Sequence, residues 1–172
     1  MRTEIDEMLQ KKVCMLGAFA VGKTSLVRRF VESIFSEVYH TTIGVKIDKK
    51  VIRVGEQEVT MILWDLAGHD GLEHLRLTYL KGASGLLLVA DGTRRDTLAA
   101  AIAIQEEAKQ VAPSAPFVLA INKSDLMDEW ELDSQEQTEL ESRGWKVILT
   151  SAKTGDGVEQ TFQILAKAML GA

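Results

Sequence analysis

The chain has 172 residues, of which 46% are hydrophobic and 26% charged, so its length and composition predict one globular domain over residues 1–172. Its formal net charge of -5 argues against the basic surface of a nucleic-acid-binding protein. Cys14 is the single cysteine, which excludes an internal disulfide and favours a cytoplasmic location. The sequence shows no signal peptide, no apolar run near the roughly 20 residues of a membrane span, and no lipidation motif. We therefore expect no membrane anchor of the chain's own, and any membrane recruitment would need a partner.

Short apolar runs alternate with longer amphipathic runs along the chain. Strands are predicted at 11–17, 45–54, 58–65, 85–91, 116–122 and 145–150. Helices are predicted at 23–33, 71–81, 96–112, 134–143 and 157–170. A turn signal at 54–57 joins the second and third strands as a hairpin, whereas the other connections run through helices and make their strands parallel. The pattern predicts an α/β fold with a six-stranded mixed sheet, one strand of it antiparallel, flanked by five helices.

The segment GAFAVGKT follows the first strand and opens the first helix. It matches G-x-x-x-x-G-K-[ST], whose glycines let the backbone curl so that its N–H groups face a phosphate. Lys23 would place a positive charge on the outer phosphates, and Thr24 would offer a hydroxyl to Mg²⁺. The plainer alternative is a glycine-bounded turn without chemistry. The nucleotide-binding residues predicted here are Gly17, Ala18, Phe19, Ala20, Val21, Gly22, Lys23, Thr24 and Ser25.

The choice of base depends on Asn122-Lys123-Ser124-Asp125, directly after the fifth strand. A carboxylate at the carboxyl end of a parallel strand can accept both the ring N–H and the 2-amino group of guanine. Adenine would leave that carboxylate unpaired, at a cost of roughly 1–3 kcal/mol or more. The alternative for N-K-x-D is a polar turn. We predict guanine contacts at Asn122, Lys123, Asp125 and Leu126, which disfavours an ATP-dependent kinase.

Two further segments lie at strand ends. Ile62 to Gly68 reads as a strand ending in D-x-x-G, so Asp65 is predicted to hold the Mg²⁺ shell, and Gly68 to offer its N–H to a terminal phosphate. Ser151-Ala152-Lys153 follows the sixth strand, where a backbone N–H would meet the guanine carbonyl. This last signal is short and gains weight only from its position relative to the others.

Together, GAFAVGKT, Thr42, DLAG, NKSD and SAK resemble the small GTPases of the Ras superfamily, and the segments around Tyr39 and Trp64 look most like its Rab branch. The resemblance implies the P-loop NTPase fold and covers nearly the whole chain. It also implies three roles: Thr42 ligates Mg²⁺ when the γ-phosphate is present, Phe35 lies against the guanine ring, and Tyr39 closes over the phosphates. Gly68 would be the hinge of the second switch loop.

Two residues depart from the family pattern where hydrolysis takes place. His69 stands where relatives have the glutamine that orients the attacking water, and Phe19 stands where many have glycine or another small residue. An imidazole can still hydrogen-bond water near neutral pH, whereas Phe19 would crowd the room that an arginine finger needs. The alternatives are a solvent-facing loop residue for His69 and packing against a switch loop for Phe19. The predicted catalytic residues are His69, Lys23 and Thr42.

The resulting hypothesis is a monomeric switch that binds GDP or GTP with Mg²⁺ and hydrolyses GTP slowly. Its switch loops would present a GTP-dependent surface to an exchange factor, an activating protein and an effector. The alternative is a GTP-dependent binding module with almost no turnover. Two arginine pairs, at 28–29 and 94–95, are expected to be solvated. Capping boxes are expected at Asp133 with Glu136 and at Asp156 with Glu159.

Overall fold

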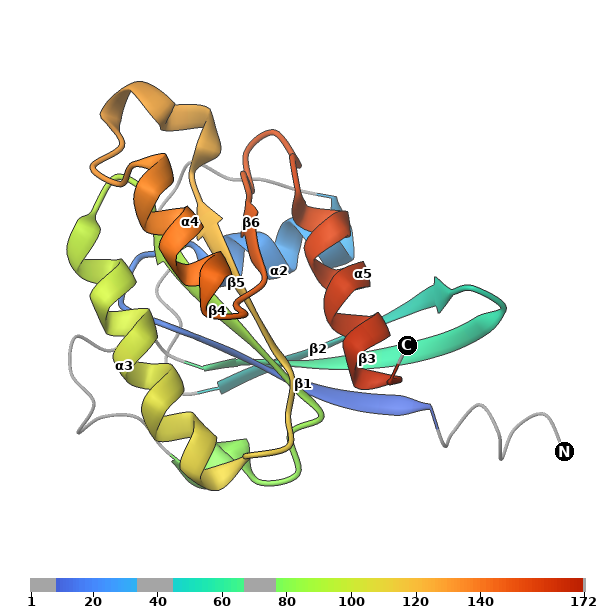
Figure 1. The fold of residues 1–172 in the computed structure, drawn as a ribbon. Helices are drawn as coiled ribbons and strands as arrows, with labels where there is room; N and C mark the ends of the chain where they lie inside the picture. Colours follow the sequence, from blue (N-terminus) through green and yellow to red (C-terminus); the bar gives the residue numbers. More distant parts are fainter. Residues whose placement is uncertain (1–8, 34–44, 67–76, 172) are drawn as a thin grey trace, which may run out of the picture.

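The computed structural model describes residues 9–33, 45–66 and 77–171. Six strands form one sheet: β1 Gln10–Gly17, β2 Val45–Val54, β3 Gln57–Leu66, β4 Gly85–Asp91, β5 Phe117–Asn122 and β6 Val147–Leu149 (Figure 1). The described α-helices are α2 Lys23–Glu32, α3 Arg95–Val111, α4 Ser134–Ser142 and α5 Val158–Met169. Two 3-10 helices are also present, η2 Leu77–Leu80 and η3 Ser124–Glu129. Within these residues, no helix is both long enough and apolar enough to cross a membrane.

The strand order is β2-β3-β1-β4-β5-β6. The β2–β3 pair is antiparallel, with Val54 opposite Gln57 across the hairpin, and the other described pairs are parallel. This confirms the predicted six-stranded mixed sheet and its hairpin. Every residue of β4 is buried, as expected for a parallel strand covered on both faces.

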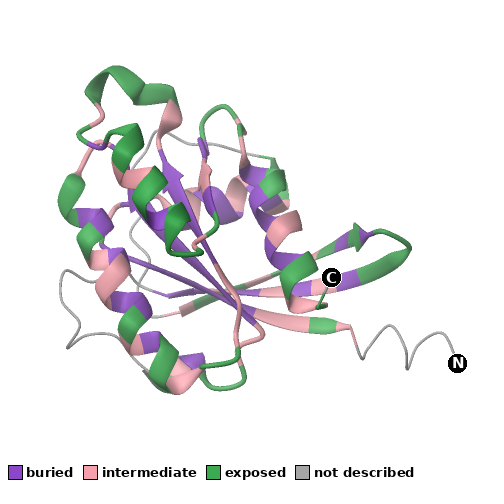
Figure 2. Ribbon diagram, viewed as in Figure 1, coloured by how far each residue is buried: buried purple, intermediate pink, exposed green. Residues whose placement is uncertain are grey.

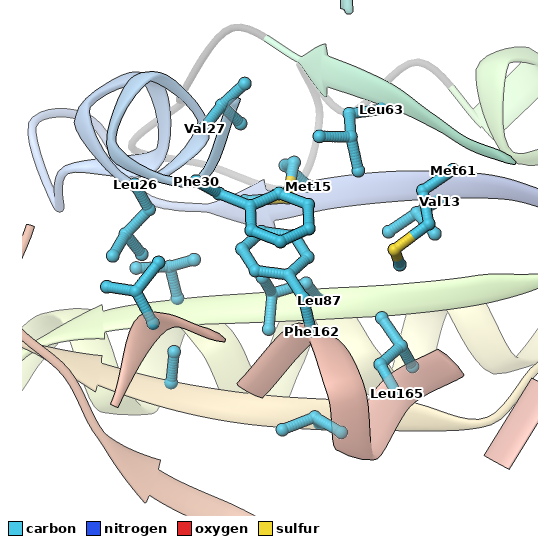
Figure 3. Close-up of a cluster of buried hydrophobic side chains, with 14 of the residues drawn as sticks. Val13, Met15, Leu26, Val27, Phe30, Met61, Leu63, Leu87, Phe162 and Leu165 are labelled. Carbon is cyan, nitrogen blue, oxygen red and sulfur yellow. The ribbon is translucent and has the colours of Figure 1, made fainter. Parts of the chain in front are cut away.

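Helices cover both faces of the sheet, and the sheet separates the core into two clusters (Figure 1). α2 and α5 pack on one face, where the rings of Phe30 and Phe162 stack with their centroids 3.8 Å apart (Figure 3). α3 packs on the other face, and α4 contributes Leu140. The central strands are buried, while the outward surfaces of the helices are exposed (Figure 2). This arrangement leaves the carboxyl ends of the parallel strands at one edge, where loops can build a site.

The structure differs from the prediction in places. Of the helix predicted at 71–81, residues 71–76 lie outside the described residues, and the described part is the 3-10 helix Leu77–Leu80. η3 was not predicted, because six residues are too few to show a helical period. The last strand is shorter than 145–150, and the Trp145 N–H is used at the end of α4, where it donates to the Leu140 carbonyl at 3.1 Å.

The two predicted capping boxes have different outcomes. Asp133 caps α4 by accepting a 3.0 Å hydrogen bond from the Glu136 N–H, but the Glu136 carboxylate pairs with Arg95 instead of returning to the cap. The prediction for Asp156 is wrong, because α5 begins one residue later, after Gly157 at φ +71°. A Cβ on Gly157 would lie 2.2 Å from the Leu149 carbonyl oxygen, so only glycine fits there.

Candidate functional site

The loop between β1 and α2 is built around two glycines that cannot be replaced without displacing neighbours. A Cβ on Gly17 would lie 2.5 Å from the carbonyl oxygen of Val89 in β4. A Cβ on Gly22 would lie 2.3 Å from Nδ2 of Asn122, and the φ of +100° at Gly22 also favours glycine. The glycine spacing read in the sequence therefore reflects close approach of this loop to β4 and β5.

Each carbonyl of the loop from residue 17 to residue 21 accepts a side-chain hydrogen bond. The Lys23 ammonium donates to Gly17 and Ala18 at 3.3 and 3.4 Å. The next three acceptors are Phe19 (from Arg94, 2.7 Å), Ala20 (from Lys123, 3.4 Å) and Val21 (from Asn122, 3.1 Å). In a planar trans peptide the C=O and N–H point in opposite directions. The N–H groups that follow the last three of these carbonyls are thus turned away from Arg94, Lys123 and Asn122, as an anion-binding loop requires.

Lys23 is held inside this loop. The residue is only 6% exposed. Burial lowers its pKa from 10.5 to about 8, while the nearby Asp65 carboxylate acts in the opposite direction. The hydrogen bonds of this buried ammonium go to neutral carbonyls, which offset only part of the cost of removing its charge from water. An anion bound in the loop would therefore stabilise the buried positive charge of Lys23.

Thr24 and Asp65 meet beside the loop. The Thr24 hydroxyl donates a 2.6 Å hydrogen bond to Oδ2 of Asp65, at the end of β3. Asp65 is buried, which raises the pKa of its carboxyl against the opposing effects of Thr24 and Lys23. Its other oxygen, Oδ1, is buried without a hydrogen-bond partner among the described residues. A hydroxyl beside an unsatisfied carboxylate oxygen suits a hard cation such as Mg²⁺.

The described residues contain no group of three or more His, Cys, Asp or Glu side chains that would hold a metal ion. Mg²⁺ does not need such a group, because it usually takes one or two carboxylates together with substrate phosphates and water. Thr24 and Asp65 are accordingly the two predicted metal ligands that the structure brings together.

Asn122 joins the phosphate loop to the loop after β6. Its Nδ2 donates to Val21, while its Oδ1 accepts from the Thr150 hydroxyl at 3.2 Å and from the Ala152 N–H at 3.3 Å. The N–H of Ala152 is therefore already used within the protein. Nearby, the Ser151 hydroxyl donates a 2.7 Å hydrogen bond to Oδ1 of Asp125. The ends of β5 and β6 thus meet at an exposed carboxylate, where the sequence predicts the base to bind.

Four predicted site residues are partly or largely exposed. Ser25 is half-buried in the first turn of α2, Leu126 is 37% exposed in η3, and Lys153 is exposed. Phe19 is 42% exposed, so its ring lies at the loop surface and not in the core. The remaining predicted site residues, namely Phe35, Tyr39, Thr42, Gly68 and His69, lie outside the described residues.

The prediction that the arginine pairs are solvated is wrong for two of their members. Arg29 donates from Nε to the Ala152 carbonyl at 2.7 Å and from Nη2 to the Lys153 carbonyl. Arg94 donates to the Phe19 carbonyl. Both arginines therefore bind the backbone of a predicted nucleotide loop from outside it. The paired arginines in the sequence did not indicate these backbone contacts, because each contact joins segments that are far apart in the chain.

Asp91, at the carboxyl end of β4, is a further residue that sequence reasoning missed. Its carboxylate is fully buried and accepts from Lys123 at 2.8 Å and from Arg94 at 3.2 Å. Burial alone would raise its pKa, but hydrogen bonds from Lys123 and Thr93 outweigh burial and lower it. Its position at the end of a parallel strand was the available signal.

Comparison with known proteins agrees with this arrangement. Residues 12–171 match the model that describes the Ras family. The Ras-related protein Rab-4B of Homo sapiens, like that of Rattus norvegicus, is 34% identical over 161 residues, which cover 92% of this chain and 76% of the relative. The Ras-related protein Rab-32C of Dictyostelium discoideum is 31% identical over 169 residues, covering 96% of this chain and 75% of the relative. This chain therefore belongs to the Ras family and is a Rab-like small GTPase.

Proposed function

We propose that this chain is a molecular switch that binds GDP or GTP with Mg²⁺ and hydrolyses GTP slowly. One observation carries the proposal: Asn122 is bonded to Val21 of the phosphate loop and to Ala152 of the loop after β6. The segment predicted to hold phosphates and the segments predicted to read the base are thus parts of one hydrogen-bonded unit. A ligand that spans them would need both a polyphosphate and a base, as a nucleotide does.

Different described residues would bind the phosphates, the Mg²⁺ ion and the base. The loop N–H groups and Lys23 would neutralise phosphate oxygens, and the bound anion would in turn favour the charged form of Lys23. Thr24 and Asp65 would hold Mg²⁺, which supplies charge neutralisation at the phosphates when it is bound. Ser151 holds one oxygen of Asp125. Asp125 would then accept from guanine, whereas adenine offers neither of the two donors that this carboxylate needs.

The rate of hydrolysis depends on His69 and Phe19. We propose that His69 orients the attacking water less effectively than glutamine does, and that Phe19 restricts access to the transferred phosphoryl group. The exposure of the Phe19 ring at the surface of the loop supports this steric role. Small GTPases of this kind hydrolyse GTP at about 10⁻⁴ to 10⁻³ s⁻¹ without a partner. The proposed rate of this chain lies at or below that range.

A nearly non-hydrolysing, GTP-dependent binding module is the second candidate, and the Phe19 and His69 substitutions are what favour it. Single-turnover hydrolysis of bound GTP with Mg²⁺ separates the two candidates, with Phe19→Gly and His69→Gln measured beside wild type. Slow but measurable turnover in wild type, raised in either variant, supports the switch. Turnover indistinguishable from the uncatalysed reaction supports the binding module. A wild type as fast as both variants would show that these residues do not impair catalysis.

Binding itself is tested by calorimetry on protein stripped of nucleotide, titrated with GDP and with ADP in the presence of Mg²⁺. We expect GDP to bind at least tenfold more tightly than ADP, because ADP leaves Asp125 unpaired. Equal affinities would overturn the proposed function. Protein loaded with GDP or with a non-hydrolysable GTP analogue can then be used to capture an exchange factor, an activating protein or an effector. A partner retained by only one of the two forms is the expected sign of a switch.

A further inference from the structure

We propose that Arg94 is a positioning residue of the phosphate loop. Through the Phe19 carbonyl, Arg94 fixes the direction of the Ala20 N–H and so strengthens phosphate binding without touching the nucleotide. This inference rests on the proposed function, because it concerns the same site. It assigns to the β4–α3 connection a role that the sequence motifs do not contain.

The Arg94 guanidinium makes two contacts that point to this role. Nη2 donates a 2.7 Å hydrogen bond to the Phe19 carbonyl, and Nε donates to Oδ2 of Asp91 at 3.2 Å. Asp91 is fully buried, whereas the Arg94 side chain is 38% exposed. The arginine therefore reaches from a buried anchor to the outer side of the loop. Hydrogen bonds from a charged donor are stronger than those between neutral groups.

The backbone of Arg94 is also held in place. Its N–H donates to the Asp91 carbonyl at 2.9 Å, and its own carbonyl accepts from the Thr97 hydroxyl at 2.7 Å. Because the main chain and the side chain are both tied to neighbours, little conformational freedom remains to be lost when the loop binds a ligand. The guanidinium is thus preorganised on the Phe19 carbonyl.

Ala20 explains why the loop needs such a contact. It has a φ of +62°, a left-handed conformation that residues other than glycine seldom adopt. The two peptide groups around Ala20 are held by Arg94, through the Phe19 carbonyl, and by Lys123, through the Ala20 carbonyl. Both cations bind the same oxygen, Oδ2 of Asp91. We call Asp91, Arg94 and Lys123 the Ala20 clamp.

The clamp has a direct consequence for phosphate binding. The peptide plane fixes the Ala20 N–H opposite the Phe19 carbonyl, and the Val21 N–H opposite the Ala20 carbonyl. Successive N–H groups around a left-handed residue form a concave site for an anion. Without Arg94, the first of these two peptides could rotate and the N–H direction would be lost for part of the time. Lys123 would still hold the second peptide.

The test compares GDP release from wild type, Arg94→Ala, Arg94→Lys and the control Arg95→Ala. Arg95 lies next in the chain but bonds Glu131 and Glu136, away from the loop. We expect Arg94→Ala to release fluorescently labelled GDP about tenfold faster than wild type, which corresponds to loss of one charge-assisted hydrogen bond. Arg94→Lys should recover part of the difference, and Arg95→Ala should behave as wild type.

A spectroscopic measurement distinguishes positioning from a general loss of stability. In NMR spectra of the GDP complex, Arg94→Ala should shift the ³¹P resonance of the β-phosphate, while the guanine imino proton bound by Asp125 keeps its position. If Arg94→Ala is poorly folded, Arg94→Met retains the aliphatic length without the donors and should show the same two effects. Arg95→Ala should shift neither resonance.

The results that would overturn the two proposals differ. A wild type that binds GDP no more tightly than ADP removes the proposed function. A wild type that prefers GDP, together with Arg94 variants that match its release rate and β-phosphate resonance, removes only the role of Arg94. Equal acceleration in Arg94→Ala and Arg95→Ala would also overturn that role, because it would show a general effect of charge at this surface.

Discussion

The indole N–H of Trp130 donates a 2.8 Å hydrogen bond to the carbonyl of Lys123. Lys123 has a φ of +74°, and it is the residue whose ammonium bonds Asp91 and the Ala20 carbonyl. The tryptophan ring also lies against Gly92, directly after Asp91. A residue outside every nucleotide-binding motif thus supports the backbone of the base-reading segment.

Gly92→Ala should destabilise the protein through this contact. The added Cβ would lie 2.1 Å from Cε2 of Trp130, so the ring must move. We expect the free energy of unfolding to fall by about 2 kcal/mol, the usual size of an overpacking effect. Urea unfolding followed by circular dichroism measures the change. In a Trp130→Ala background, Gly92→Ala should cost much less, and equal costs in the two backgrounds would refute the steric explanation.

Arg29→Ala should loosen the loop after β6. The substitution removes the donors to the Ala152 and Lys153 carbonyls. We expect GDP affinity to fall by about 1 kcal/mol, roughly fivefold, since Arg29 acts on the loop and not on the ligand. Arg53→Ala is the control, because the exposed Arg53 side chain pairs with Glu58 at 3.3 Å in the β2–β3 hairpin, away from the loop after β6. If both variants lose the same affinity by calorimetry, the loop contact is not the cause.

The stability of the nucleotide-free protein should depend on pH because of Lys23. Its pKa is about 8 in the folded protein and 10.5 in its ordinary environment. Between these values the unfolded chain binds more protons than the native chain, so stability should rise with pH across this window. The rise should approach about 3 kcal/mol. Urea unfolding between pH 7.5 and about 10.5 measures it.

Two variants isolate this contribution. Lys23→Met should remove the rise and stabilise the nucleotide-free protein near neutral pH, since no buried ammonium remains. Lys167→Met replaces an exposed lysine of α5 and should keep the rise. A rise that persists unchanged in Lys23→Met would show that another group causes it.

Asp125→Asn should change which base the protein prefers. The new amide can donate to the 2-carbonyl of xanthine but cannot accept from both donors of guanine. We expect GDP affinity to fall by about 1–3 kcal/mol and xanthosine diphosphate to gain relative to GDP. Competition of both nucleotides for the same protein measures the ratio. Asp128→Asn makes the same charge change in the exposed part of η3 and should leave the ratio unchanged.

Local patterns predicted the fold well. β4 is a continuous apolar run, as expected of a parallel strand buried on both faces, and the buried residues of α3 repeat at the helix period, so packing and propensity agree. The loop around Gly17 and Gly22 could be predicted because only glycine fits where its backbone lies close to neighbouring atoms. η3 and the late start of α5 were missed, since short helices and alternative caps depend on the neighbouring turns.

The supporting side chains of the site could not be predicted in the same way. Arg94 and Phe19 are 75 residues apart in the chain, and Arg29 and Ala152 are 123 apart. Each pair meets only because the fold brings helices and loops that are distant in the chain to one edge of the sheet. An arginine on a helix or a loop has no pattern that distinguishes a carbonyl partner from solvent, so these contacts follow from the tertiary structure alone.

The stacked rings of Phe30 and Phe162 have a consequence for biosynthesis. They join the helix that carries Lys23 and Thr24 to α5, the last helix described. While the ribosome is still making the chain, the phosphate loop exists long before the ring that supports its helix. We therefore expect a nascent chain to retain nucleotide only after α5 has emerged from the exit tunnel.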